Sequence, residues 1–99
     1  MSEGTKFDIG KLRYDLLDWD FIDEMVLVLM DGAKVHGEFN WQKVENGRLR
    51  YWTAAGRHWR KDLDGDPIDP DHGTSHAAHE AVNAMFRRWF DKNASKPTS

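Results

Sequence analysis

The stretch from Gly73 to Phe90, GTSHAAHEAVNAMFRRWF, constrains the fold most, because its residue types repeat with a helical period. At about 100° per residue, one broad arc is wholly apolar: Ala77, Ala78, Ala81, Val82, Met85, Phe86 and Trp89. The opposite arc is polar: His76, His79, Glu80, Asn83 and Arg87. We therefore expect a helix whose apolar arc faces the core and whose start is capped by Thr74 or Ser75.

Two earlier segments also have helical patterns. Residues 18–36 begin with an acidic turn and carry apolar side chains around most of the circumference, so this helix should be buried on more than one side. Packing against a second subunit would explain that distribution. Residues 48–62 form the other helix, whose expected packing face comprises Leu49, Trp52, Gly56 and Trp59. A glycine inside a helix costs about 1 kcal/mol relative to alanine, so we expect Gly56 to permit close helix approach.

Length and composition narrow the class of protein. The 99 residues predict one domain, 1–99, with an ordered core over about 6–91 and polar tails. The expected fold is an all-α, compact three-helix domain with an extended N-terminal segment. Five Trp and five Phe supply more apolar surface than a small core needs, which favours a homo-oligomer. The chain has no cysteine, which excludes disulfides, thiolate catalysis and cysteine-bound zinc.

Charge and hydropathy indicate where such a protein works. A net charge of −3 disfavours bulk binding to nucleic acid or to an anionic membrane. The first residues lack the apolar segment of a signal peptide, and the longest apolar run, Met25–Met30, is too short to span a bilayer. We therefore expect a cytoplasmic protein with neither nucleic acid nor a membrane as partner.

Histidines and carboxylates on the three helices form a candidate metal site. Asp20 and Glu24 lie one turn apart on the first helix, and this spacing suits metal ligands as well as surface charges that complement the helix dipole. If the helices converge, Glu24 would join His58, His76 and His79 around Mg²⁺, Mn²⁺ or Zn²⁺. Two histidines in a polar seam between helices would be the structural alternative. The acidic loop at 62–73 lacks the glycine and final glutamate of a calcium loop, so we reject calcium binding there.

Cationic residues suggest an anionic ligand. Lys11 and Arg13 follow Gly10 in the N-terminal segment and could approach an anion, although a solvated tail is the simpler interpretation. Arg57 precedes His58, and this pair could bind a phosphate or belong to a solvated basic face. Trp41 could stack on a base or fill the core. Together with the metal candidates, these residues suit a nucleotide polyphosphate.

Once assembled, these residues resemble the N-terminal domain family of phage dATP/dGTP diphosphohydrolases. The matching residues are Lys6-Phe7-Asp8-x-Gly10-Lys11-x-Arg13, Gly32-Ala33-Lys34, Asn40-Trp41, Arg57-His58, the acidic loop and His76-x-x-His79-x-x-x-Asn83. The resemblance spans about residues 6–90 and implies a phage origin, an all-α fold and a purine-nucleotide ligand. It adds Lys34, Asn40, His76, His79 and Asn83 to the ligand-binding candidates.

The resemblance has one gap. In the longer proteins this domain precedes a catalytic part related to all-α nucleotide pyrophosphohydrolases, which hold metal with E-x-x-E and E-x-x-D helix pairs. Here Asp20-x-x-Asp23 and Glu24 match that pattern only partly, and no second acidic helix pair follows. The family resemblance therefore does not establish that this chain is an enzyme.

Two functional hypotheses follow. In the first, the chain binds a purine nucleotide or a cyclic (di)nucleotide without turnover, and in an infected bacterium it would sequester a host immune signal. In the second, it is a metal-dependent nucleoside polyphosphate diphosphohydrolase, with Glu24, His58 and His79 as catalytic candidates. The metal would then generate the attacking hydroxide, helped by Asp71 or Asp20 as a base. A helical assembly protein with structural histidines is a third interpretation. The first hypothesis is slightly favoured.

Overall fold

The computed structural model describes residues 9–94, and its regular structure is helical. In chain order the elements are a 3-10 turn η1 (Tyr14–Leu16), helix α1 (Trp19–His36), a 3-10 turn η2 (Asn40–Lys43), helix α2 (Gly47–Leu63) and helix α3 (His76–Ala94). The all-α prediction is confirmed, and the first two helices lie within one residue of their expected bounds. Helix α3 continues to Ala94, beyond Phe90 and into the expected polar tail. Residues 1–8 and 95–99, including Lys6, Phe7 and Asp8 of the family motif, lie outside the described residues.

The helix ends follow from local chemistry. At the start of α1, the Asp18 carboxylate accepts a hydrogen bond from the backbone N–H of Asp20 at 3.1 Å. Gly37 ends α1 with a φ of 97° and donates its N–H to the Ala33 carbonyl, a conformation that glycine adopts without a steric penalty. At the start of α3, the Ser75 hydroxyl accepts from the N–H of Ala78 at 3.1 Å, which confirms Ser75 as the cap.

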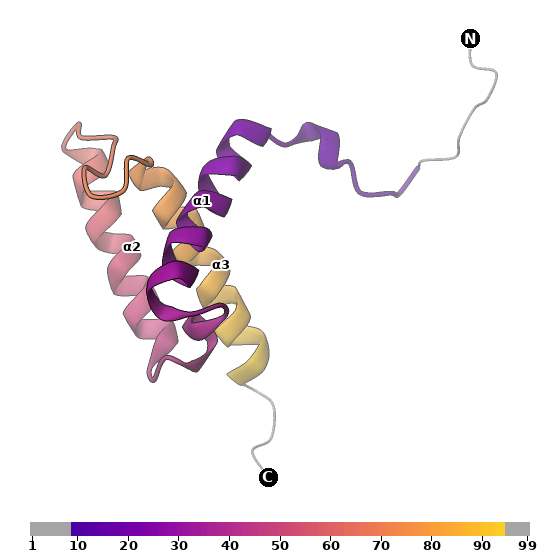
Figure 1. Ribbon diagram of the computed structural model, residues 1–99. Helices are drawn as coiled ribbons and strands as arrows, with labels where there is room; N and C mark the ends of the chain where they lie inside the picture. Colours follow the sequence, from indigo (N-terminus) through magenta and orange to yellow (C-terminus); the bar gives the residue numbers. More distant parts are fainter. Residues whose placement is uncertain (1–8, 95–99) are drawn as a thin grey trace.

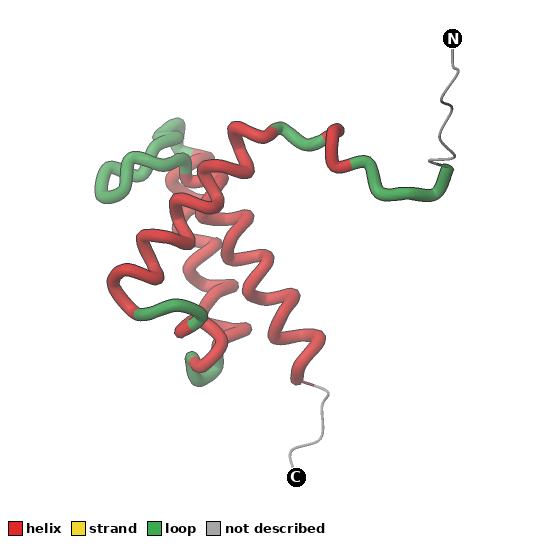
Figure 2. Tube along the Cα trace, turned by 45° about the vertical axis from the view of Figure 1, so that its right-hand side comes forward, coloured by secondary structure: helices red, strands yellow, loops and turns green. Residues whose placement is uncertain are grey.

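Helix α3 is the centre of the arrangement. Both α1 and α2 pack against it, whereas α1 and α2 hardly touch each other (Figures 1 and 2). The segment that leads into α1 projects away from the three helices (Figure 1), as expected for an extended N-terminal segment. None of the helices in this part of the chain is long and apolar enough to cross a membrane.

An aromatic cluster joins η2, α2 and the second half of α3. The ring of Trp41 stacks on Phe86 with centroids 4.4 Å apart, and Tyr51 meets Phe86 edge-on at 4.7 Å. Gly47 begins α2 against the ring of Phe90, so close that a Cβ at this position would overlap the ring. Of the two roles considered for Trp41, this packing supports the structural one.

The burial of α3 extends beyond the apolar arc that was expected to face the core. Among the described residues, the buried apolar side chains are Ala78 and Val82, whereas Met85 on the same arc is 38% exposed. His76, His79 and Asn83 from the polar arc are buried instead. Because α3 is covered by a helix on each side, its polar arc is enclosed as well.

The apolar face expected to pack α2 is also exposed within this chain. Leu49, Trp52 and Trp59 each keep more than half of their surface accessible, and a Cβ on Gly56 would meet no atom within 4 Å. Helix α2 contacts α3 through its opposite side, so the expected packing face has no helix of the same chain against it. Helix α1 likewise has no buried residue, so the chain by itself does not bury α1 on more than one side.

Candidate functional site

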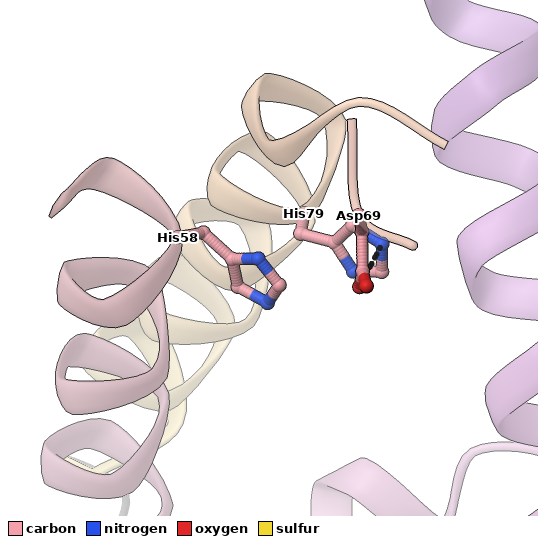
Figure 3. A group of neighbouring side chains, drawn as sticks. All are labelled: His58, Asp69 and His79. Atoms are coloured by element: carbon pink, nitrogen blue, oxygen red, sulfur yellow. Dashed lines mark ion pairs between the residues drawn. The ribbon is translucent and has the colours of Figure 1, made fainter. Parts of the chain in front are cut away.

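Three side chains from three segments converge at one end of α3. His58 comes from α2, Asp69 from the loop between α2 and α3, and His79 from the second turn of α3 (Figure 3). One nitrogen or oxygen atom from each of them lies within 4.8 Å of the other two. We call these three residues the His–Asp–His cluster. Among the described residues, these three side chains have ligand atoms close enough together to share a metal ion.

The loop places Asp69 by hydrogen bonds along its own backbone. The N–H of Asp69 donates to the Thr74 carbonyl at 2.8 Å, and the N–H of Gly73 donates to the Asp69 carbonyl at 2.7 Å. Gly73 has a φ of 75°, which closes this turn at little steric cost. The Asp69 side chain accepts the N–H of Asp71 through Oδ1 at 2.9 Å. Oδ2 is thereby left to face the histidines.

Asp69 Oδ2 has two histidine neighbours. Nδ1 of His72 lies 3.0 Å from it, and Nε2 of His79 lies 3.4 Å from it. The Thr74 hydroxyl oxygen lies 2.8 Å from the same His79 nitrogen. His72 orients the carboxylate, in the way that residues around a metal ligand commonly do.

A second imidazole pair extends the cluster between α2 and α3. The rings of His58 and His79 stack with centroids 4.4 Å apart and an interplanar angle of 8°. Nδ1 of His58 lies 2.8 Å from Nδ1 of His76, so one of these nitrogens carries the shared proton. Nε2 of His76 is buried and has no hydrogen-bond partner.

Burial and mutual proximity determine the charges of the cluster. Burial, followed by the nearby His79 and His76, lowers the pKa of His58 to about 4. Burial also lowers the pKa of His79, although Asp69 partly offsets this effect. Burial alone would raise the pKa of Asp69, but hydrogen bonds from His72 and the Asp71 backbone make the net change a decrease. At neutral pH the cluster therefore presents two neutral imidazoles and one carboxylate.

These protonation states and distances fit a divalent cation. Metal ligands must be neutral imidazole or ionised carboxylate, which is the state that the cluster adopts. Ligand atoms about 2.1 Å from a tetrahedral ion lie roughly 3.4 Å from one another. The His79–Asp69 pair already has this separation of 3.4 Å. Three protein ligands would leave at least one coordination position for water or a phosphate oxygen.

A groove of about 1000 Å³ adjoins the cluster between α1 and α2. His79, Val82, Asn83 and Phe86 of α3 line its floor. The α1 wall is mainly apolar, whereas the α2 wall contributes Arg50 and Arg57. His79 belongs to both the groove and the cluster. The groove has the volume of a small-molecule site, and one end of it adjoins side chains that could hold a metal ion.

Of the four predicted metal ligands, the structure brings His58 and His79 together and sets His76 against His58. Glu24 lies elsewhere: its carboxylate accepts the N–H of Ser75 at 2.9 Å and joins α1 to the start of α3. This hydrogen bond lowers the pKa of Glu24. Glu24 is therefore not a member of the cluster, although its carboxylate is ionised.

The ten predicted ligand-binding residues are not all brought together, and two of them, His58 and His76, are the imidazole pair between α2 and α3 described above. Five of them line the groove: Asn40, Trp41, Arg57, His79 and Asn83. Lys34 is exposed and lies outside the groove lining. Lys11 and Arg13 belong to the projecting N-terminal segment, where Arg13 forms an ion pair with Asp15 at 2.7 Å. The structure thus brings the predicted residues from Asn40 onwards to the groove or to the neighbouring histidines. Lys11, Arg13 and Lys34 do not line the groove.

Sequence reasoning missed Asp69 and His72 as site residues. Both belong to the acidic loop at 62–73, which was considered only for calcium binding and for Asp71 as a base. The available signal was the spacing Asp69-x-x-His72-Gly73, because the glycine lets the turn close and point both side chains at α3.

The fold and the site define a small all-α domain with a His–Asp–His cluster at the end of an interhelical groove. The chain belongs to the family described as dATP/dGTP diphosphohydrolase, N-terminal, whose family model matches residues 1–98. A similar protein named dATP/dGTP diphosphohydrolase, from Salmonella phage PMBT28, is 38% identical over 96 residues. That match covers 97% of this chain but 32% of the phage protein, so the chain spans about a third of its relative's length. No solved structure matches the chain.

Proposed function

We propose that this domain binds a purine deoxynucleoside triphosphate in the groove, together with a divalent cation at the His–Asp–His cluster. The observation that carries the proposal is the convergence of His58, Asp69 and His79 beside the apolar groove. Of the cations expected from the sequence, Mn²⁺ fits the cluster better than Mg²⁺, because two of the three ligands are imidazoles and Mg²⁺ is bound mainly through oxygen atoms. The family description and the name of the phage relative support the choice of purine nucleotide.

Groove and cluster offer complementary chemistry for such a ligand. The apolar walls suit the base and sugar, and the volume lies at the upper end of the usual range for small-molecule sites. Arg57 lines the groove one residue before His58, so its guanidinium is available for a phosphate near the cluster. A bound cation would neutralise phosphate charge and lower the pKa of a coordinated water.

Metal-dependent hydrolysis of the nucleotide to a monophosphate and diphosphate is the second candidate function. The three-ligand arrangement favours it, because structural metal sites are usually closed by four protein ligands and catalytic sites keep one position open. Binding without turnover is favoured by the absence, from the described helices, of a second acidic pair of the E-x-x-E or E-x-x-D kind that the related pyrophosphohydrolases use to hold metal. Sequestration of a cyclic dinucleotide immune signal stays a prediction of the sequence.

Calorimetry with the purified chain tests the proposal. We expect Mn²⁺ alone to bind with one site per chain, and dATP or dGTP to bind more tightly with Mn²⁺ present than dTTP does. Arg57→Ala should weaken nucleotide binding at least about tenfold, which is the cost of losing one charged hydrogen bond. Arg60→Ala is the matched control, because Arg60 lies on the same helix, forms an ion pair with Asp64 and does not line the groove.

Mass spectrometry of the incubated nucleotides separates the candidate functions. Recovery of intact nucleotide in stoichiometric amount would support binding without turnover. Formation of dAMP or dGMP beyond stoichiometry, only with Mn²⁺ and not with His79→Ala, would support hydrolysis. A cyclic dinucleotide that binds in place of dATP would support the signal-binding hypothesis. Failure of every nucleotide to bind, with or without metal, would disprove the proposal.

A further inference from the structure

The exposed face of α2 has a regular apolar pattern. Four large side chains and one glycine follow each other at alternating steps of three and four residues: Leu49, Trp52, Gly56, Trp59 and Leu63. We call this set the α2 stripe. Each of its four large residues is between 56% and 64% exposed. The three-and-four spacing is that of the a and d positions of a coiled coil, which normally contact a second helix.

The stripe is turned away from the rest of the domain. Helix α2 faces α3 with Tyr51, Ala54 and His58, which are partly buried. At about 100° per residue, these three positions lie opposite the stripe. The groove is lined from α2 by Arg50, Tyr51, Ala54 and Arg57, none of which belongs to the stripe. A partner helix on the stripe would therefore leave the groove accessible.

The order of residues in the stripe is nearly symmetric about Gly56. The two tryptophans lie four residues before and three residues after the glycine, and the two leucines lie seven residues to either side. A second copy of the helix, running antiparallel, would set Trp52 beside Trp59 and Leu49 beside Leu63. Gly56 at the crossing would allow the two helix axes to approach closely, and a Cβ added there meets nothing within the chain.

Charges along one flank of the stripe select the antiparallel orientation. Arg48, Ala55 and Asp62 follow at intervals of seven residues beside the stripe. In an antiparallel pair each flank faces the same flank of the other copy, so Asp62 would lie near Arg48 of the second copy, twice per dimer. Arg48 also forms an ion pair with Asp91 of its own chain at 2.6 Å, so Asp62 would add a second carboxylate beside it. In a parallel pair this flank would face Thr53 and Arg60, and Arg48 would keep only Asp91 of its own chain as an opposite charge. Flanking charges of this kind set the orientation of paired helices.

We propose that two copies of this chain form an antiparallel dimer through the α2 stripe. The interface is isologous, since the same residues of each copy meet across a two-fold axis near Gly56. Partly buried aromatic residues at the centre of a contact dominate protein–protein affinity, and here the two tryptophans hold that position. The proposal is independent of the proposed function, because it uses no groove or cluster residue.

Sedimentation of the pure chain at micromolar concentrations is the first test, and we expect a dimer. Trp52→Glu and Trp59→Glu should each raise the dimer Kd about thirtyfold or more, while helicity stays at the wild-type level. Val35→Glu is the matched control, because Val35 is 73% exposed on α1 and should not affect the dimer. A wild-type monomer would overturn the proposal, and so would tryptophan variants with the wild-type Kd. A partner other than a second copy would also leave the pure chain monomeric.

Disulfide cross-linking tests the orientation without relying on destabilising variants, because the natural chain has no cysteine. A mixture of Leu49→Cys and Leu63→Cys proteins should give a cross-linked dimer that joins one of each. Leu49→Cys protein alone should stay uncross-linked. Rapid cross-linking of Leu49→Cys with itself would show a parallel pair and overturn the proposed orientation.

Discussion

The imidazole of His58 on α2 lies flat against that of His79 on α3, with ring centroids 4.4 Å apart. Protonation of both rings would place two positive charges in contact at a partly buried seam. Asp69 offsets one such charge at most, since its Oδ2 already has His72 as a neighbour at 3.0 Å. The seam between α2 and α3 is therefore stable with neutral imidazoles and should weaken when they become charged.

Stability should fall on mild acidification. His58 has a pKa near 6.5 when the chain is unfolded and about 4 in the fold, so the unfolded chain binds the extra proton between these values. The contribution of His58 is complete above pH 6.5 and declines as pH falls towards 4. We expect a loss on the order of 1–2 kcal/mol, since water around this partly exposed ring screens the full effect. Urea unfolding at successive pH values, with chelator present, measures it.

A variant separates this effect from general acid destabilisation. His58→Gln keeps a polar side chain of similar size but removes the titrating group. Its stability should decrease less between pH 6.5 and 4 than that of the wild type. Equal slopes for both proteins would show that His58 does not cause the pH dependence.

Metal affinity should depend on the cluster and not on Glu24. Asp69→Asn and His79→Ala each remove a proposed ligand, and we expect Mn²⁺ affinity to fall at least about tenfold in each. Glu24→Ala should retain the wild-type affinity for Mn²⁺, because the Glu24 carboxylate binds the N–H of Ser75. Calorimetric titration with the metal alone measures all three. A large loss with Glu24→Ala would restore Glu24 to the metal site.

Glu24 should instead contribute to folding stability. Its hydrogen bond to Ser75 spans two helices, and a carboxylate near the start of α3 also complements the helix dipole. Glu24→Ala should cost about 1 kcal/mol in the free energy of unfolding. Because this bond lowers the pKa of Glu24, its contribution is present above the unfolded pKa near 4.5 and fades below it. The exposed Glu38→Ala is the control, for which denaturant unfolding should show little change.

Helix positions and caps could be predicted from local sequence, because periodicity, Asp18, Gly37 and Ser75 act over a few residues. Which side of each helix contacts its neighbours could not be predicted from the sequence. Periodicity identified the apolar stripe of α2, but it does not say whether a stripe is covered by the same chain or by another. The stripe was identified as a packing face without a named partner, and within the chain α2 meets α3 through Tyr51 and His58.

The same difference between local pattern and contacts across the fold explains which site residues were predicted and which were missed. His58 and His79 were predicted because histidines in a helical pattern stand out in sequence. Asp69 was missed because its position depends on a loop closed by Gly73 and by backbone hydrogen bonds to Thr74. Glu24 was predicted as a metal ligand because spacing along α1 cannot show that its carboxylate reaches the N–H of Ser75 at the start of α3.

Gly47 should be the least replaceable glycine in the described chain. A methyl group at this buried position would overlap the ring of Phe90, which is itself packed against Trp89 and Tyr51. We expect Gly47→Ala to lower the free energy of unfolding by about 1–3 kcal/mol, as overpacking usually does. Gly32→Ala is the matched control: it lies inside α1 with open space around it and should stabilise by up to about 1 kcal/mol. Thermal unfolding compares them, and adding Phe90→Leu to Gly47→Ala should recover part of the loss. No recovery would mean that the backbone at the start of α2, and not the overlap with Phe90, requires glycine.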